Sequence, residues 1–75
     1  MNKERRKQIS AVIGRLSDCA GDFESIKDEE DESRENIPEN LQSGDRYSES
    51  EECSGALEDA ASGIQEIIDN IENII

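Results

Sequence analysis

The feature that most constrains this chain is the spacing of its apolar residues, which alternates between three and four positions in two separate stretches. The first stretch keeps this spacing at Ile9, Val12, Leu16, Cys19, Phe23 and Ile26. The second keeps it at Cys53, Leu57, Ala60, Ile64, Ile67, Ile71 and Ile74. This alternation places side chains on one face of an α-helix and is typical of a coiled-coil seam. The sequence therefore predicts an all-α chain with two amphipathic helices.

Turn-forming residues separate the two stretches. Pro38 and the run Ser43-Gly44-Asp45 cannot lie inside a continuous helix, so the joint falls between the stretches. Pro38 is expected to open one short turn that ends at Leu41. We expect three apolar residues of the joint to fold over the end of the core: Ile37, Leu41 and Tyr47.

The boundaries of the helices follow from the same residues. Ser48 and Glu51 have the spacing of a capping box, which predicts that the second helix begins between Tyr47 and Ser50. The expected organisation is a single unit over residues 1–75, with a helix over 3–32, a loop over 33–46 and a helix over 47–74.

Two helices of about 28 residues, or ~42 Å each, pack most simply as an antiparallel hairpin. A turn near residue 40 makes the numbers of facing residues add to about 79, as for Leu16 and Gly63. A second apolar set beside each seam widens the stripe beyond what one hairpin covers. A core this small supplies only ~3–5 kcal/mol, so a four-helix homodimer is expected. Its candidate interface residues are Ile13, Ile68, Ile71 and Ile75.

The two cysteines, Cys19 and Cys53, fall on the predicted seam. Nothing in the sequence marks secretion, so reduced thiols in the core are favoured over a disulfide. In the expected hairpin they lie about 10 Å apart along the axis, which is too far for a disulfide.

Charge is distributed unevenly along the chain. It carries 8 Lys and Arg against 20 Asp and Glu, a net charge of −12. The first 16 residues have a balance of +4 and the other 59 a balance of −16. We expect the basic start to lie beside Asp69 and Glu72 at the end of the second helix. The opposite end gathers the run 28–32 and three glutamates of the second helix, with too few bases to neutralise them.

Composition and motifs exclude several classes of function. The chain has no His, no Gly-rich phosphate loop and no Cys/His metal spacing, so catalysis, a cofactor and a metal site are not expected. The acidic balance argues against direct nucleic-acid binding, and no apolar run is long enough to cross a membrane. We therefore expect a cytoplasmic protein that acts through protein partners.

Several segments resemble small acidic helical-hairpin proteins that tailed phages and prophages of Gram-positive bacteria encode. The likeness lies in the joint 36–43, in Arg46-Tyr47, in Leu57-Glu58-Asp59-Ala60 and in the segment 67–72. It implies a viral origin, a host bacterial cytoplasm and a hairpin fold, but it implies no reaction.

The resulting hypothesis is a phage-encoded, non-enzymatic inhibitor of a bacterial antiviral defence system. Its acidic surface would bind a nuclease or another immune effector, with apolar anchors at the joint. The candidate partner-binding residues are Asp28, Glu29, Glu30, Asp31, Glu32, Ile37, Leu41, Tyr47, Glu49, Glu51 and Glu52.

Three alternatives stay open. DNA mimicry is a stronger version of the inhibitor, and its charge density requires dimerisation, because one hairpin carries about one charge per 3.5 Å against ~1.7 Å for duplex DNA. A structural or regulatory coiled-coil adaptor of the phage, with no role in immunity, is the second alternative. A sponge for a nucleotide signal is the third, and it is disfavoured by the scarcity of bases and aromatic residues.

Overall fold

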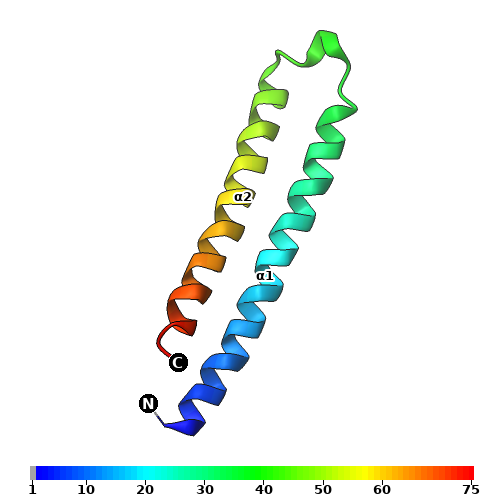
Figure 1. Ribbon diagram of the computed structural model, residues 1–75. Helices are drawn as coiled ribbons and strands as arrows, with labels where there is room; N and C mark the ends of the chain where they lie inside the picture. The colour runs from blue at the N-terminus through cyan, green and yellow to red at the C-terminus, as the bar shows by residue number, and fades with distance from the viewer. Residues whose placement is uncertain (1) are drawn as a thin grey trace.

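The computed structural model describes residues 2–75 as two long antiparallel helices joined by a short loop (Figure 1). The elements are α1 (Lys3–Glu35), a single 3₁₀ turn η1 (Glu39–Leu41) and α2 (Asp45–Glu72). The two helices pack against each other and form a rod of 60 × 15 × 13 Å. The predicted all-helical hairpin is confirmed.

The first helix begins at Lys3 as expected, and the other three helix ends differ from the expected bounds by two or three residues. α1 begins after Asn2, whose side-chain oxygen accepts a 2.8 Å hydrogen bond from the backbone N–H of Arg5. α2 begins after Gly44 with no side-chain cap, so the predicted capping box of Ser48 and Glu51 is wrong and both residues lie inside the helix. The helix starts earlier because η1 reverses the chain tightly, and the Gly44 N–H already bonds to the carbonyl of Leu41 at 3.2 Å.

Pro38 opens the turn as expected. It precedes η1, and its carbonyl accepts a 2.9 Å hydrogen bond from the N–H of Leu41. The side-chain amide of Gln42 donates to the carbonyl of Ile37 at 3.2 Å and closes the loop on itself. The joint is thus a compact turn held by its own backbone and one side chain.

The seam between the helices keeps six of the predicted residues, namely Ile9, Leu16, Phe23, Leu57, Ile64 and Ile71, and is shifted by one position at the others. The α1 seam residues, all buried or half-buried, are Ile9, Ile13, Leu16, Ala20, Phe23, Lys27, Glu30 and Arg34. The matching residues of the second half are Tyr47, Ser50, Ser54, Leu57, Ala61, Ile64, Ile68, Ile71 and Ile75. Both series alternate between three and four positions without a break. Six residues predicted for the seam are exposed instead: Val12, Cys19, Ile26, Cys53, Ile67 and Ile74.

This change of phase corrects the predicted role of Ile68. Its side chain is only 3% exposed and lies in the core with Ala20 and Ala61, so it does not face a second molecule. The three other candidates, Ile13, Ile71 and Ile75, are half-buried along the same seam. The two alanines are the small residues that let the helices approach closely at the centre of the rod.

The register of the hairpin also differs from expectation. Arg34 of α1 bonds to Ser50 and Ser54 of α2, and Ile13 shares a hollow with Ile71, so the numbers of facing residues add to about 84 rather than 79. The first turns of α1 therefore extend past the end of α2 (Figure 1). Their basic side chains do not pair with Asp69 or Glu72: among residues 2–75 the ion pairs are Lys27–Asp31 and Arg34–Asp31.

The thiols of Cys19 and Cys53 are both free, as expected, but both are exposed, so their predicted place in the core is wrong. Their side chains lie outside the core because each cysteine comes one position before a seam residue, namely Ala20 and Ser54.

Candidate protein-interaction surface

The loop end of the seam is polar, and Arg34 is its centre. One guanidinium nitrogen of Arg34 donates to Ser54 Oγ at 2.9 Å, to the Ser50 carbonyl at 3.1 Å and to Ser50 Oγ at 3.2 Å. The other donates to Asp31 at 2.7 Å. Ser50 Oγ in turn donates to Glu30 at 2.8 Å. We call this set the polar clasp: Lys27, Glu30, Asp31, Arg34, Ser50 and Ser54.

Hydrogen bonds within the clasp shift the pKa values of Lys27, Asp31 and Arg34. The hydrogen bond from Lys27, at 2.8 Å, and those from Ser54 and Arg34 hold the pKa of the Asp31 carboxyl well below its usual range. Each of Lys27 and Arg34 donates its own hydrogen bond to Asp31, and that bond raises the pKa of the donating group. Within the described chain, every buried side-chain nitrogen and oxygen has a hydrogen-bond partner. The clasp is therefore a satisfied polar network that joins the two helices.

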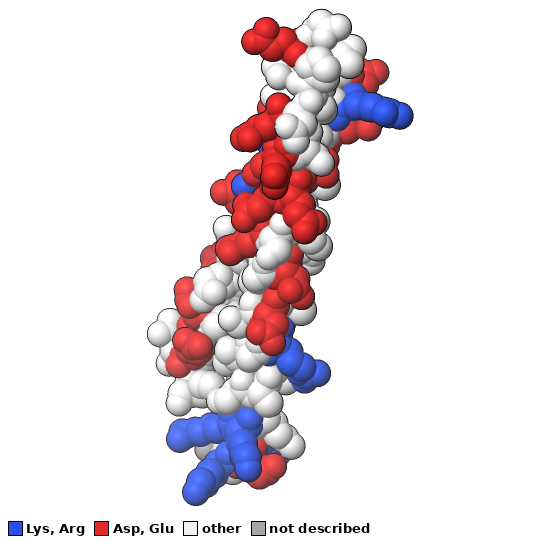
Figure 2. Space-filling view, turned by 90° about the vertical axis from the view of Figure 1, so that its right-hand side faces the viewer, with Lys and Arg blue, Asp and Glu red and all other residues white. Residues whose placement is uncertain are grey.

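Acidic side chains dominate the surface around the clasp. Figure 2 shows most of the blue basic side chains at the lower end of the rod, where α1 begins, a few more along the right-hand edge and near the upper end, and red acidic side chains over much of the rest of that face. Asp31 is the one carboxylate in residues 2–75 that forms an ion pair. The acidic surface is consequently not neutralised by the chain itself.

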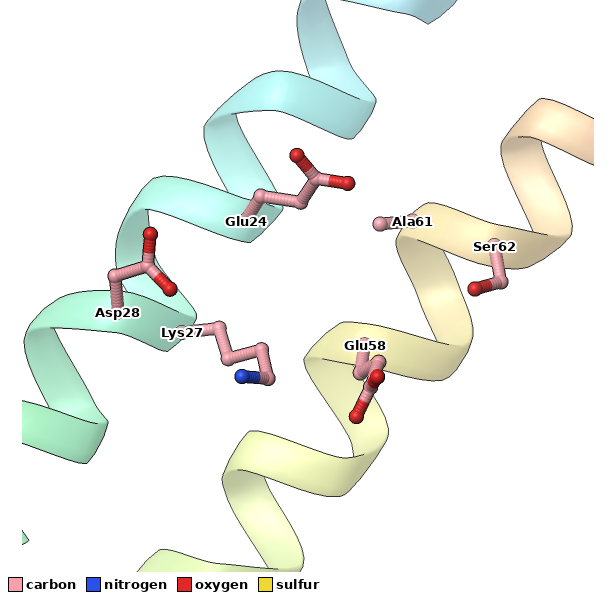
Figure 3. Close-up of a pocket in the computed structure, with 6 residues that line it drawn as sticks. All are labelled: Glu24, Lys27, Asp28, Glu58, Ala61 and Ser62. Atoms are coloured by element: carbon pink, nitrogen blue, oxygen red, sulfur yellow. The ribbon is translucent and has the colours of Figure 1, made fainter.

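An acidic hollow of about 240 Å³ opens between the helices next to the clasp. In Figure 3, Glu24 and Lys27 extend from α1 toward α2, and Glu58 extends from α2 beside them. Asp28, Ala61 and Ser62 complete the lining. The hollow places three carboxylates around one ammonium group, so it favours an approaching cation over an anion.

A second hollow, of about 510 Å³, lies at the loop and is mainly apolar. Its lining includes Ile37, Pro38, Leu41 and Tyr47. Leu41 is 56% exposed, so it does not fold fully over the core as expected. The Arg34 guanidinium lies 6.0 Å from the centre of the Tyr47 ring and links this tip hollow to the polar clasp.

The structure divides the predicted partner-binding residues into three groups. Glu30 and Asp31 belong to the clasp, and Asp28 lines the acidic hollow. The three apolar candidates meet at the tip hollow: Ile37, Leu41 and Tyr47. The remaining carboxylates are exposed on the last turns of α1 and the first turns of α2: Glu29, Glu32, Glu49, Glu51 and Glu52.

Four residues of the clasp were not predicted as part of the site: Lys27, Arg34, Ser50 and Ser54. Their signal was present, because Lys27 and Arg34 continue the seam spacing from Ala20, and Ser50 and Ser54 continue it from Ala61. These four side chains are polar, whereas the predicted seam contained apolar residues alone.

No helix in the described part of the chain is long and apolar enough to span a membrane. Residues 2–75 hold no group of three or more His, Cys, Asp or Glu side chains arranged to bind a metal ion. The chain matches no protein-family model, no curated protein and no solved structure.

Proposed function

We propose that this protein is a non-enzymatic inhibitor of a bacterial antiviral effector, acting in the host cytoplasm by binding a basic groove of a nuclease or a similar protein. The binding surface is the acidic end, which comprises Asp28, Glu29, Glu30, Asp31, Glu32, Glu49, Glu51 and Glu52. The observation that carries the proposal is the exposed carboxylate surface around an apolar hollow at the tip of a rigid hairpin.

The arrangement has the anatomy of a protein interface. A small apolar centre surrounded by polar and charged groups is the usual pattern, and complementary charge adds speed and specificity of association. Leu41 and Tyr47 supply the apolar centre, and the exposed glutamates on the last turns of α1 and the first turns of α2 supply the charge. The polar clasp keeps the two acidic helix ends at a fixed separation, which reduces the entropy lost on binding.

The length of the rod argues against mimicry of a whole DNA duplex as the basis of binding. A charge of −12 over 60 Å is one charge per 5 Å, against one per ~1.7 Å in duplex DNA. Two hairpins side by side would carry 24 negative charges over the same 60 Å, or about one charge per 2.5 Å, which is still below the density of duplex DNA. In the proposal, the hairpin pairs into a four-helix homodimer, and each acidic end binds locally.

The test compares plating of phage on lawns with and without a defence system while the chain is expressed. The binding variant is Asp28→Asn/Glu29→Gln/Glu32→Gln. Its matched control, Asp18→Asn/Asp59→Asn/Glu66→Gln, removes the same charge from exposed residues elsewhere on the rod. The binding variant should lose about ten-fold or more of the rescue, and the control should keep it.

Two results would contradict the proposal. One is equal rescue by the binding variant and its control. The other is absence of rescue by the unaltered chain together with enrichment of phage proteins only in a pull-down, which would instead support the adaptor alternative.

A further inference from the structure

We propose that two copies of this chain pair antiparallel through one apolar side of the hairpin, with the α1 helices face to face at Cys19. This deepens the homodimer of the proposed function by assigning its face and its orientation. The face is a row that we call the apolar flank: Val12, Cys19, Ile26, Cys53, Ala60, Ile67 and Ile74.

The flank is a second heptad row beside the seam. Its members recur every seven residues in each helix, and each precedes a seam residue by one position. Its large side chains are open to solvent: Val12, Ile26, Ile67 and Ile74 are 42–76% exposed. A row of this kind uncovered on both helices is what a four-helix bundle buries and a lone hairpin cannot.

Both halves of the row lie on the same side of the rod. The residues that follow seam residues by one, such as Glu24 and Glu58, meet across the helices at the acidic hollow. The residues that precede seam residues by one must therefore meet across the helices on the opposite side. There, Gln8, Ile9, Val12, Ile13 and Ile71 line a third hollow of about 320 Å³ with an apolar surface. The hairpin thus has one acidic side and one apolar side.

The chain exposes more surface than a compact monomer of its size. The chain exposes 5795 Å², about 1,200 Å² more than the ~4,600 Å² that size scaling gives for a compact monomer of 8.4 kDa. A standard interface buries about 800 Å² on each partner, so a second copy accounts for most of this excess. The core itself holds few buried apolar side chains, namely Ala20, Ala61 and Ile68.

The distribution of charge selects the antiparallel orientation. The basic first turns of α1 extend past α2 at one end of the rod, and the acidic end lies at the other. In a parallel pair the two acidic ends would lie side by side and repel each other. In an antiparallel pair the basic turns of each copy lie toward the acidic end of the other.

The register locates the two-fold axis. Because facing numbers add to about 84, Ile74 lies level with residue 10 of α1 and Cys53 with residue 31. The middle of the apolar flank is therefore level with residue 20 of α1, next to Cys19. A two-fold axis there brings the two copies of Cys19 within about 5 Å along the rod and separates the two copies of Cys53 by about 30 Å.

Cross-linking of the purified chain with a short bis-maleimide tests both the face and the orientation. The Cys53→Ser variant, which keeps Cys19, should form a covalent dimer as readily as the unaltered chain. The Cys19→Ser variant, which keeps Cys53, should form little. Equal cross-linking of the two variants, or preferential cross-linking through Cys53, would overturn the antiparallel arrangement.

Light scattering at micromolar concentration tests the face with a second pair of variants. A Cβ at Gly63 or Gly55 meets nothing within 4 Å, so neither substitution forces the two helices apart at its first side-chain atom. Gly63 follows the flank residue Ala60 by three positions, whereas Gly55 precedes Glu58 of the acidic hollow by three. Gly63→Arg should reduce the mass from twice 8.4 kDa to 8.4 kDa, and Gly55→Arg should leave it doubled.

A monomeric unaltered chain, or a Gly63→Arg variant that stays dimeric, would contradict the proposed face. Neither measurement involves a target protein, so failure of the dimer is distinct from failure of the inhibitor. If Gly63→Arg loses its helical circular dichroism, the cysteine pair still decides the outcome, because it leaves the flank almost unaltered.

Discussion

At the scale of single residues, Arg34 joins the helices where the seam has no apolar side chains. Its guanidinium bridges Asp31 on its own helix to Ser50 and Ser54 on the other. The pairs Lys27–Asp31 and Arg34–Asp31 have the i,i+4 and i,i+3 spacings of helix neighbours, so a helical sequence pattern could identify them. The bonds from Arg34 to Ser50 and Ser54 depend on the register of the hairpin, and the sequence predicted that register about five residues away from the observed one.

The hydrogen bonds of Asp31 in the polar clasp predict how the stability of the hairpin depends on pH. The folded chain lowers the pKa of Asp31 below its usual value of 3.8, so the ionised carboxylate stabilises the hairpin above that pH. This contribution is lost as the pH falls from 3.8 toward the lower pKa of the folded state. Asp31→Asn should therefore lower the urea midpoint at pH 7, and its difference from the unaltered chain should shrink below pH 3.8.

Asp59→Asn is the matched control, because Asp59 is exposed, changes the net charge equally and forms no ion pair in the described structure. Its midpoint at pH 7 should equal or exceed that of the unaltered chain, since it only reduces repulsion. A loss for Asp59→Asn as large as that for Asp31→Asn would show that the clasp does not stabilise the hairpin.

At the scale of the elements, the helices could be predicted and the face between them could not. Apolar spacing and the Pro38 turn are local signals, and both gave the correct element type. The choice of seam was ambiguous because each helix carries two adjacent apolar rows in the same spacing. The observed row contains Ala20 and Ala61, which let the backbones approach closely, and it leaves Ile67 and Ile74 for the flank.

Glycine substitution distinguishes the inside of a helix from its cap. Gly21 lies within α1, and a Cβ there meets nothing within 4 Å, so Gly21→Ala should stabilise the hairpin by about 1 kcal/mol through helix propensity. Gly44 caps α2, and a Cβ there would lie 3.3 Å from the Leu41 carbonyl oxygen. Gly44→Ala should therefore destabilise the chain, because alanine is a poor N-cap and the turn must shift. Urea unfolding at one protein concentration measures both changes, and a gain at Gly44 would contradict the assigned cap.

At the scale of the whole molecule, the rod is electrically polarised. The first 16 residues carry a balance of +4, and the rest carry −16 over two helices held side by side. This polarity was predictable from the sequence, but the extension of the basic turns beyond α2 was not, because it follows from the register. The extension leaves the basic groups without an ion-pair partner in the described hairpin and the acidic end with little internal neutralisation.

Salt should therefore stabilise this protein. Repulsion among the carboxylates of the acidic end opposes folding, and raising the ionic strength from about 0.01 M to about 0.15 M shortens the screening length from ~30 Å to ~8 Å. The ion pairs of the clasp are weakened by the same screening, but they involve only Asp31, whereas the repulsion involves every exposed carboxylate near it. The midpoint of thermal unfolding should rise with salt in the unaltered chain. It should rise less in Asp28→Asn/Glu29→Gln/Glu32→Gln, which removes part of the repulsion and leaves the clasp intact. A midpoint that falls with salt would mean that attraction between the basic and acidic ends of paired rods outweighs repulsion within each acidic end.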